Sequence, residues 1–454
     1  MTQHQIGRLA DTLRRTIHAD RVLTTGPDYD AGRAIWNGAV LARPGVIVRC
    51  GEHTEVQAAV RAAREAGVPL SVRGGGHDWA GRSLSDGGLT IDLSGMRQVT
   101  VDPEAKVAEV AGGATAADVV RAAQPFGLTA ATGSAGSVGM AGLTLGGGYG
   151  PLSGRFGLAL DNLLAADVVL ADGSLVTADA EREPDLFWAL RGGGGNFGVV
   201  TSMRVRLHAV PTLLSGMVLF AWEQAGAVLA GLQDVLTESP DELTVQSGVL
   251  AGPDGKPVVF LSPTWSGDDA AVGERALARL GGLGTPLLSQ IGPATMPEML
   301  AGIDAQFPFG RHVEIRPRSV PSLSPGVREV LSVAGSTLTS PCSAVSVHHL
   351  HGAAARVPLT ETAFGNRDPH LMIEIIALWE PGDARAAGHR AWAADVARAL
   401  EPDALPGGYP NLLVDDESAQ IAHAYGPNAE RLLELKHRYD PDRTFRAIPL
   451  PDPS

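Results

Sequence analysis

Three glycine-rich segments, each beside an apolar run, limit the fold of this chain more than any other feature of its sequence. They lie at residues 74–76, 146–148 and 192–195. Glycine has no Cβ, so a backbone built from it can approach a ligand or another backbone closely. Such segments bury little apolar area and cannot form a core by themselves. Their presence within the first two hundred residues is best explained by one long ligand that lies across this part of the fold.

Strand and helix patterns alternate around the first glycine segment. An apolar strand at 46–48 precedes a helix through Val56, Val60 and Ala63, and a second strand at 70–72 leads into the glycines. The expected N-cap of the helix is Thr54, with Gln57 as its capping-box partner. Gly67 is placed to end it in the left-handed conformation. This order predicts a βαβ unit.

The same order recurs after residue 100, with a strand at 107–110, a cap at Thr115, a helix through 119–123 and a terminating Gly127. Further strands of this first region are predicted at 89–93, 166–170 and 199–205.

The pattern changes near residue 208. Helices are predicted at about 225–236, 270–280 and 327–333, and strands at 244–250, 258–261, 344–350 and 371–378. This arrangement favours an antiparallel sheet covered by helices on one face. A last helix at about 428–437 is stopped by Asp440-Pro441 and is expected to return to the first region. The chain is therefore predicted to be α+β, with units at 1–207, 208–404 and 405–454.

The bulk composition excludes several classes of protein. A length of 454 residues favours more than one folding unit, and 36 basic against 50 acidic residues disfavour nucleic acid and anionic membranes as partners. The two cysteines, Cys50 and Cys342, provide neither a disulfide framework nor the spacing of a metal site. The N-terminus lacks a signal-peptide pattern, and no apolar run has the length of a membrane span. We expect a cytoplasmic monomer or homodimer that acts on a small molecule.

His77 directly follows the first glycine segment. Successive glycines after a strand expose backbone N–H groups in a concave nest that suits a pyrophosphate. A titratable ring at the end of this nest points at whatever the nest holds. On spacing alone, a hydrogen bond from His77 to a loop carbonyl remains an equal alternative.

Taken in order, the glycine segments and four companion motifs resemble a known family. The companions are Ile-Trp-Asn-Gly at 35–38, Ile-Asp-Leu-Ser-Gly-Met at 91–96, Tyr-Pro-Asn at 409–411 and Tyr-Asp-Pro at 439–441. Together they resemble the berberine-bridge-enzyme-like branch of the vanillyl-alcohol-oxidase / p-cresol-methylhydroxylase superfamily of FAD-linked oxidases, and in length and layout its bacterial 6-hydroxy-D-nicotine oxidase-like enzymes. The likeness is most specific in the first two hundred residues and looser between about 210 and 400.

The resemblance implies a two-part FAD-binding domain of the PCMH type at 1–207, a substrate-binding domain at 208–404 and a C-terminal segment at 405–454 that returns to the first domain. It also implies that a ring nitrogen of His77 bonds covalently to the 8-methyl carbon of the flavin, for which a neutral imidazole is a suitable nucleophile. Such attachment raises the reduction potential of the flavin in these enzymes. The cofactor-binding residues expected from the resemblance are Arg73, Gly74, Gly75, Gly76, His77, Gly81, Ser134, Ser137, Val138, Gly139, Gly142, Gly148, Val200, Tyr409 and Asn411.

Departures from the family pattern sharpen this expectation. Ala135 stands where many members have a cysteine that makes a second flavin bond, so a single attachment is expected. Leu143 and Arg443 replace a histidine and an asparagine, and Ala-Ile-Pro-Leu at 447–450 replaces the usual Gln-Asn-Ile, which puts flavin contacts from this tail in doubt. Val138 corresponds to a gate position beside the flavin, where a small residue is typical of oxidases.

Oxidation of an alcohol or amine also needs a group that removes a proton. Tyr409 lies in a motif that the family places beside the flavin, although Leu412 replaces a second tyrosine that serves the chemistry in many relatives. Two further candidates, His349 and His351, alternate on one face of a predicted strand with Val345 and Val347. A purely structural role for this pair is as well supported, and no third ligand completes a metal site.

Glu374 is the last candidate base, because it interrupts an otherwise apolar strand. A buried carboxylate is costly unless it is paired. Glu374 is therefore expected either to meet an arginine, namely Arg316, Arg318 or Arg356, or to face the substrate cavity.

The sequence thus predicts an FAD-dependent oxidase, singly attached to its flavin, that oxidises a small alcohol, amine or secondary metabolite and reduces oxygen to hydrogen peroxide. Three alternatives remain: a dehydrogenase with another electron acceptor, a flavin-dependent oxygenating enzyme, and a flavin-binding protein without turnover.

Overall fold

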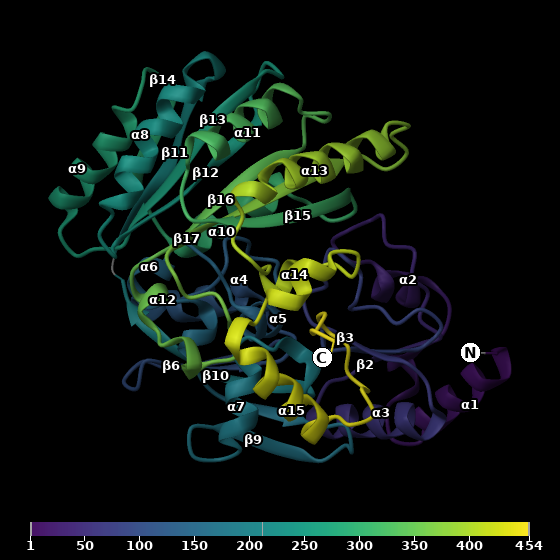
Figure 1. Ribbon diagram of the computed structural model, residues 1–454. Coiled ribbons are helices and arrows are strands. Elements are labelled where there is room, and N and C mark those ends of the chain that lie inside the picture. The colour runs from purple at the N-terminus through teal and green to yellow at the C-terminus, as the bar shows by residue number, and fades with distance from the viewer. Residues whose placement is uncertain (1, 211, 453–454) are drawn as a thin grey trace.

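Three β-sheets organise the computed structural model, which describes residues 2–210 and 212–452. A seven-stranded sheet and its helices form the upper half of the molecule in Figure 1, and the two smaller sheets lie in the lower half. The two smaller sheets use residues 22–209, and the large sheet uses residues 213–379.

The four-stranded sheet delivers the chain into the first glycine segment. Its strands are β1 (Val22–Leu23), β2 (Val46–Arg49), β3 (Leu70–Arg73) and β4 (Leu89–Asp92), in the order β1-β2-β4-β3. β2 and β3 both run parallel to β4, and helix α3 (His53–Ala66) connects them. Helix α1 (Gln3–Leu13) packs against α3, and their apolar faces share one core with the strands. The predicted βαβ unit is therefore confirmed.

The start of α3 differs from the prediction. Glu52 occupies the N-cap position, and Thr54 lies inside the first turn, where its hydroxyl donates to Glu52. The predicted partner Gln57 donates instead to the carbonyl of Gly173. The expected capping box of Thr54 and Gln57 is therefore wrong, because neither side chain is free to bond the amides of the first turn. Gly67 does end the helix, with φ +60°.

The six-stranded sheet is antiparallel, and the other two glycine segments connect its strands, residues 146–148 between β7 and β8 and residues 192–195 between β9 and β10. It contains β5 (Val99–Asp102), β6 (Val107–Ala111), β7 (Leu128–Ala130), β8 (Leu163–Val169), β9 (Leu175–Asp179) and β10 (Val199–Ala209). Helix α4 (Ala116–Ala123) starts at the predicted cap, where Thr115 and Asp118 form a capping box. Helices α5 (Met140–Gly146) and α7 (Pro184–Leu190) each run directly into a glycine segment.

The seven-stranded sheet is antiparallel throughout, in the order β14-β11-β13-β12-β16-β17-β15. Its strands are β11 (Leu213–Ala221), β12 (Leu243–Ala251), β13 (Pro257–Trp265), β14 (Pro286–Ala294), β15 (His312–Val320), β16 (Ala344–Leu350) and β17 (His370–Trp379). Four helices cover its outer face: α8 (Ala225–Thr237), α9 (Ala270–Gly281), α11 (Pro325–Ser336) and α13 (Ala386–Leu400). The predicted antiparallel sheet with one helix-covered face is confirmed.

The alternation of side chains along β16 and β17 decides which residues reach the interior of the molecule. Val345 and Val347 belong to the core under the helices, as does Ile373. Because neighbours in an antiparallel pair share a face, Ser346 opposite Glu374 points the other way, toward the glycine segments. Helix α10 (Met296–Gln306) lies between this inner face and the lower half.

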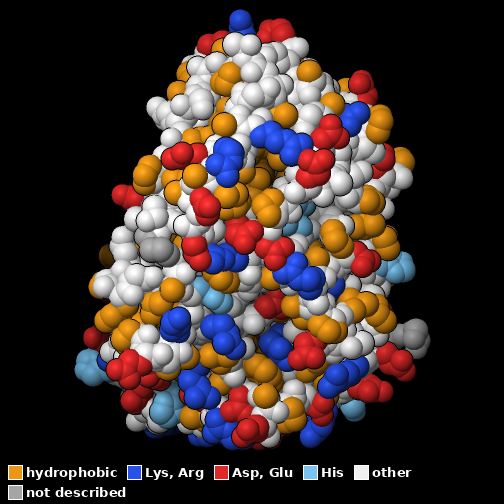
Figure 2. All heavy atoms as spheres, turned by 90° about the vertical axis from the view of Figure 1, so that its left-hand side faces the viewer, with side chains coloured by type: hydrophobic (Ala, Val, Ile, Leu, Met, Phe, Trp, Pro, Cys, Tyr) orange, Lys and Arg blue, Asp and Glu red, His pale blue; other side chains and the backbone are white. Residues whose placement is uncertain are grey.

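The C-terminal part of the chain returns to the lower half, beside α7 (Figure 1). It contains α14 (Ser418–His423) and α15 (Ala429–Tyr439), so the predicted last helix is confirmed. The remaining helices are short: α2 (Pro27–Arg33), α6 (Ser153–Phe156) and α12 (Ala353–Arg356). No described helix is both long enough and apolar enough to cross a membrane. On the face drawn in Figure 2, acidic and basic side chains are interspersed rather than gathered by sign.

Candidate active site

A large cavity separates the glycine segments from the inner face of the seven-stranded sheet. It encloses about 2390 Å³ of space, part of which is open to solvent. The part of this space that a water-sized molecule can enter is about 430 Å³, within the ~300–1,000 Å³ that is typical of sites for drug-sized ligands. Its walls contain residues from the first and third glycine segments, Leu145 and Tyr149 on either side of the second, and residues of β12, β13, β15, β16 and β17.

The first glycine segment forms one wall and leaves its backbone donors free. Within the described chain, the N–H groups of residues 74–77 donate to no protein acceptor. A Cβ on Gly75 would lie 2.3 Å from the nitrogen of Gly139, so glycine is required for the two loops to pack this closely. A row of unpaired N–H groups beside a cavity is a nest for an anion such as a pyrophosphate.

The C-terminal tail forms another part of the wall. Residues 445–448 line the cavity beside Gly194 and Gly195. Asn196 holds this tail, since its amide oxygen accepts from the backbone N–H of Ala447 at 2.8 Å and its amide nitrogen donates to the carbonyl of Ile448 at 2.9 Å. The departures at 447–450 had put contacts from this tail in doubt, yet the tail is attached through backbone atoms, which depend little on side-chain identity.

Most of the predicted cofactor-binding residues line this cavity. They are Gly74, Gly75, Gly76, His77, Ser134, Val138, Gly139, Gly142, Val200, Tyr409 and Asn411. Ala135 and Leu143, two of the departures from the family pattern, lie in the same wall.

Four predicted residues support the wall rather than line it. Arg73 pairs with Asp92 and donates to the carbonyl of Ala34. Gly81, at φ +84°, leaves no room for a Cβ beside Val40. The backbone N–H of Gly148 donates to the hydroxyl of Tyr409 at 2.8 Å. Ser137 bonds His77.

The ring of His77 is fixed on three sides. It stacks on Trp36 with ring centroids 5.1 Å apart, and Phe309 meets it edge-on at 5.2 Å. Its Nε2 lies 2.8 Å from Oγ of Ser137, and Nδ1 makes no hydrogen bond within the described chain. Burial lowers the pKa of His77 to about 4, although nearby Asp304 opposes the shift. The imidazole is therefore neutral at pH 7, with one nitrogen unused.

Tyr409 is buried at the cavity wall, and two donors engage its hydroxyl. The backbone N–H of Gly148 and the amide of Asn411 both donate to it, at 2.8 and 3.2 Å. Burial raises the pKa of Tyr409 to about 12. A phenol oxygen that already accepts two hydrogen bonds is a poor acceptor for a further proton, so the geometry suits Tyr409 to hold the loop at Gly148 and to donate.

Tyr149 is a cavity residue that the sequence did not single out. Its hydroxyl lies 2.8 Å from Nε2 of His370, and Nδ1 of His370 lies 2.7 Å from the carbonyl oxygen of Asp368. A carbonyl only accepts, so Nδ1 carries the proton of His370 and Nε2 accepts from Tyr149. The hydroxyl of Tyr149 keeps its lone pairs, and a proton that it accepted could be balanced by transfer of its own to His370. The signal for Tyr149 was its place directly after the second glycine segment, but its partner lies 221 positions away.

Glu374 faces the cavity and is near a histidine rather than an arginine. Its Oε2 lies 3.4 Å from Nε2 of His348. Of the two expected alternatives, facing the cavity is confirmed and pairing with an arginine is not, because Arg316 and Arg318 alternate with Pro317, the residue opposite Glu374 in the strand register. The arginines therefore point to the other face of β15 and pair there with Glu417. Arg356 pairs with Asp241.

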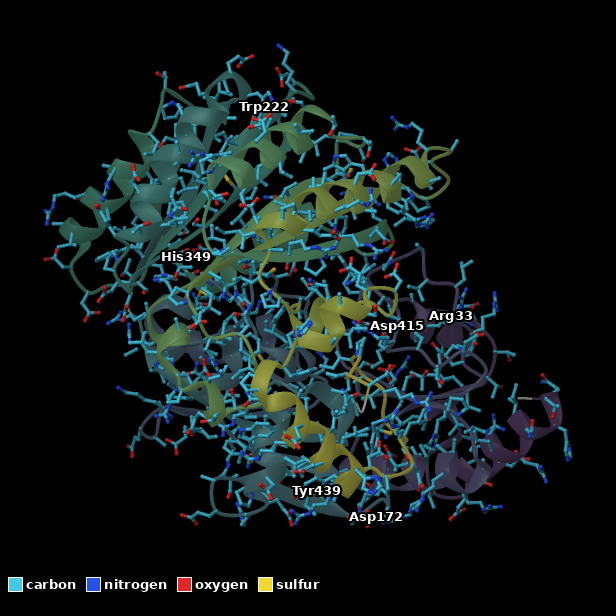
Figure 3. The ribbon with its side chains drawn as sticks, viewed as in Figure 1. Arg33, Asp172, Trp222, His349, Asp415 and Tyr439 are labelled. Atoms are coloured by element: carbon cyan, nitrogen blue, oxygen red, sulfur yellow. The ribbon has the colours of Figure 1, made fainter. Side chains whose placement is uncertain are left out.

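The other two predicted histidines lie together but away from the main cavity. His349 and His351 stack with centroids 4.0 Å apart, which agrees with the predicted alternation. Figure 3 shows His349 at the junction between the large sheet and the lower half of the molecule. Among the described residues, the main cavity is lined on this strand by His348 and not by His349 or His351. No group of three ligating side chains that could hold a metal ion occurs in the described chain.

A second cavity of about 1290 Å³ adjoins the first. The residues that line both include Ser134, Tyr149 and His348, so a molecule in the second can approach the first across these side chains. His349 lines only the second. Among the described residues that line it, Glu298 is the one carboxylate and there is no lysine or arginine.

The residues of the main cavity fit an FAD. The unpaired N–H groups at 74–77 suit its pyrophosphate, and the space beside Gly142, where a Cβ would meet nothing within 4 Å, leaves room for a flat ring. Two buried donors in the wall, Trp79 Nε1 and Ser83 Oγ, have no protein partner and are available to a ligand.

Comparison with known proteins agrees with this fit. The chain matches the family model of the FAD binding domain over residues 44–179 and that of berberine and berberine-like proteins over residues 408–448. It is 32% identical over 456 residues to (R)-6-hydroxynicotine oxidase of Paenarthrobacter nicotinovorans, which covers 95% of this chain and 96% of the relative. It is also 32% identical over 437 residues to the FAD-linked oxidoreductase aurO of Gibberella zeae, covering 93% of this chain and 84% of the relative.

A solved structure has the same fold. The crystal structure of 6-hydroxy-D-nicotine oxidase from Arthrobacter nicotinovorans superposes with a TM-score of 0.86 and 30% identity, over 95% of this chain and 98% of that one. The chain therefore belongs to the berberine-bridge-enzyme-like family of FAD-linked oxidoreductases, and its FAD-binding fold is of the PCMH type.

Proposed function

We propose that this protein is an FAD-dependent oxidase that carries its flavin on a single covalent bond to His77 and oxidises a small, uncharged or cationic alcohol or amine. The observation that carries the proposal is the state of His77: a neutral ring, fixed on three sides at the cavity wall, with Nδ1 unbonded. Ala135 provides no second attachment, since alanine has no nucleophilic group.

The flavin, when bound, would supply a hydride acceptor, and the residues around it would provide binding and proton transfer. The N–H groups of residues 74–77 would hold the pyrophosphate, and the tail at 445–448 would close the cavity over it. Val138 and Gly139 lie in the same wall, and the small side chain of Val138 at the gate position beside the flavin supports the oxidase assignment.

We assign removal of the substrate proton to Tyr149 in partnership with His370. The hydroxyl of Tyr149 already donates to Nε2 of His370, so it is able to accept a proton from substrate while passing its own to the histidine. Burial raises the pKa of Tyr149 well above its usual value, which disfavours a free tyrosinate, and it lowers the pKa of His370 to about 4, so a proton passed to His370 would be held only transiently. Tyr409, whose oxygen accepts two hydrogen bonds, would hold the loop at Gly148.

The substrate class follows from the second cavity. Its described lining has one carboxylate and no lysine or arginine, so an anionic substrate would find no permanently charged counter-ion there. Hydroxyl and amide groups of Thr244, Gln246 and Thr264 offer hydrogen bonds to hydroxyl or amino groups. The pair of His348 and Glu374 at the boundary between the cavities would favour a cationic amine over a carboxylate.

The test of covalent attachment is acid precipitation of the purified holoprotein. We expect the flavin absorbance in the wild-type pellet and, for His77→Ala, in the supernatant. Wild-type flavin that is released by acid would refute the attachment, and a yellow His77→Ala pellet would place the attachment elsewhere.

Oxygen consumption with peroxide formation, measured across a panel of alcohols and amines, tests the oxidase assignment. Turnover with artificial acceptors but not with oxygen would indicate a dehydrogenase, and labelled oxygen in the product would indicate an oxygenating enzyme.

A further inference from the structure

Asp304, in the last turns of α10, is linked to His77 through the side chain of Ser137. Its Oδ1 accepts the backbone N–H of Ser137 at 3.1 Å and the hydroxyl of Ser137 at 2.7 Å. Ser137 in turn contacts Nε2 of His77 at 2.8 Å. Among the described residues, no lysine, arginine or histidine forms an ion pair with Asp304.

The hydroxyl of Ser137 has a single proton, and the direction of that proton determines which ring nitrogen of His77 is protonated. A serine hydroxyl has one proton, and a carboxylate can only accept, so that proton is directed to Asp304. The hydroxyl can then serve Nε2 of His77 only as an acceptor. Nε2 must therefore carry the ring proton of the neutral imidazole, which leaves the lone pair on Nδ1.

The surrounding backbone is shaped for this contact. A Cβ on Gly136 would lie 2.8 Å from Oδ2 of Asp304, so glycine at this position lets the carboxylate reach Ser137. Trp36 and Phe309 fix the plane of the imidazole, so the direction of the Nδ1 lone pair is fixed with the tautomer.

We propose that Asp304 and Ser137 form a relay that holds His77 as the Nε2–H tautomer and draws off its proton when Nδ1 attacks the flavin. This inference rests on the covalent attachment proposed above and names the residues that promote it. Asp304 and Ser137 are positioning residues, because both act on the bond through His77.

The chemical balance of attachment requires such a proton path. Nδ1 forms a C–N bond to the 8-methyl carbon of the flavin, and that carbon loses one hydrogen. Nε2 loses its proton through the hydroxyl of Ser137 toward Asp304. Dioxygen, the co-reactant, takes up the electron pair and both protons and becomes hydrogen peroxide. In the interval before Nε2 loses its proton, the ring is positively charged, and the carboxylate of Asp304 stabilises that charge.

The experiment follows attachment in time rather than turnover. Apoprotein is mixed with FAD in air, and the fraction of flavin in the acid-precipitated pellet is measured at intervals, with bound but unattached flavin measured in the supernatant. We expect Asp304→Asn and Ser137→Ala to bind FAD and to slow its attachment by about 10- to 100-fold. Ser137→Thr keeps the hydroxyl and is expected to restore most of the rate. Asp268→Asn, which removes an exposed carboxylate far from His77, is the matched control.

The outcomes separate the two proposals. If wild-type flavin never becomes acid-stable, the covalent assignment itself fails. If wild-type flavin attaches while Asp304→Asn and Ser137→Ala attach it at the wild-type rate, the relay is refuted and Asp304 only ties α10 to the loop. If Asp304→Asn no longer binds FAD, the comparison of Ser137→Ala with Ser137→Thr decides, because equal rates for these two variants would also refute the relay.

Discussion

Lys436, buried in α15, fastens the C-terminal tail to the wall of the cavity. Its Nζ donates to the carbonyls of Asn196 and Phe445, both at 2.7 Å, and to Oδ2 of Asp440 at 2.6 Å. The three protons of the ammonium group are thus all used. The side chains of Lys436 and Asp440 are 7% and 0% exposed, so solvent replaces none of these contacts.

Substitution of Lys436 by methionine keeps most of the side-chain volume and removes the charge. Asp440 would be left buried without its cation, although the backbone N–H groups of Thr444 and Phe445 would still donate to it. Breaking a buried ion pair by removing one partner costs ~3–5 kcal/mol, and two carbonyls would also lose their donor. We expect the free energy of unfolding to fall by about 4 kcal/mol.

Urea unfolding of the holoprotein, followed by circular dichroism, measures this loss. Lys256→Met is the matched control, because Lys256 is 77% exposed and its removal should change stability by less than about 0.5 kcal/mol. The double variant Lys436→Met/Asp440→Asn should be less destabilised than the sum of its single variants, since it removes the stranded charge. A loss below about 1 kcal/mol for Lys436→Met would refute the reasoning, as it would mean that the pair contributes no more than one exposed at the surface.

Two further results are expected. Tyr149→Phe should slow anaerobic bleaching of the flavin by substrate about 10²- to 10⁴-fold without loss of bound flavin, as expected for removal of a general base, and an unchanged rate would exclude Tyr149 from that role. Burial lowers the pKa of His370 to about 4, against about 6.5 in the unfolded chain, so the unfolded state binds the extra proton between these values. The stability that this neutral histidine contributes is complete above pH 6.5 and is lost as the pH falls to 4, by about 3 kcal/mol. His370→Gln should flatten the measured dependence of unfolding free energy on pH in this window, and an identical slope would contradict the shift.

Local sequence patterns predicted the features that are held by contacts between residues close together in the sequence. The capping box of Thr115 and Asp118 forms because both residues are free to bond each other's amides. At α3, Thr54 and Gln57 had the same spacing but found other partners, one of them 116 positions away. Local patterns did not predict β11, β14 or β15, of which β14 and β15 are the two edges of the large sheet. An edge strand has one neighbouring strand, and these two alternate between exposed and partly buried residues or contain arginine and proline, so their apolar period is weak.

The candidate site could be predicted where its residues are contiguous and could not where they meet across the fold. His77 and the glycine segments stand out in the sequence because each is a short motif. Asp304 contacts Ser137, which lies 167 positions away in the sequence, and a local sequence pattern does not predict such a contact. On β16 the alternation was correct, yet the face that meets the cavity is that of His348, because it depends on how β17 aligns with β16.

The position of residues 445–448 in the cavity wall has a consequence for when this protein acquires its cofactor. These residues leave the ribosome after every other residue that lines the cavity. The lower sheets can fold earlier, as N-terminal parts of a chain do during synthesis. The complete wall, however, exists only once Asn196 and Lys436 have bound the tail. We therefore expect loading of the flavin to follow translation, because the last part of the cavity wall is not in place before then.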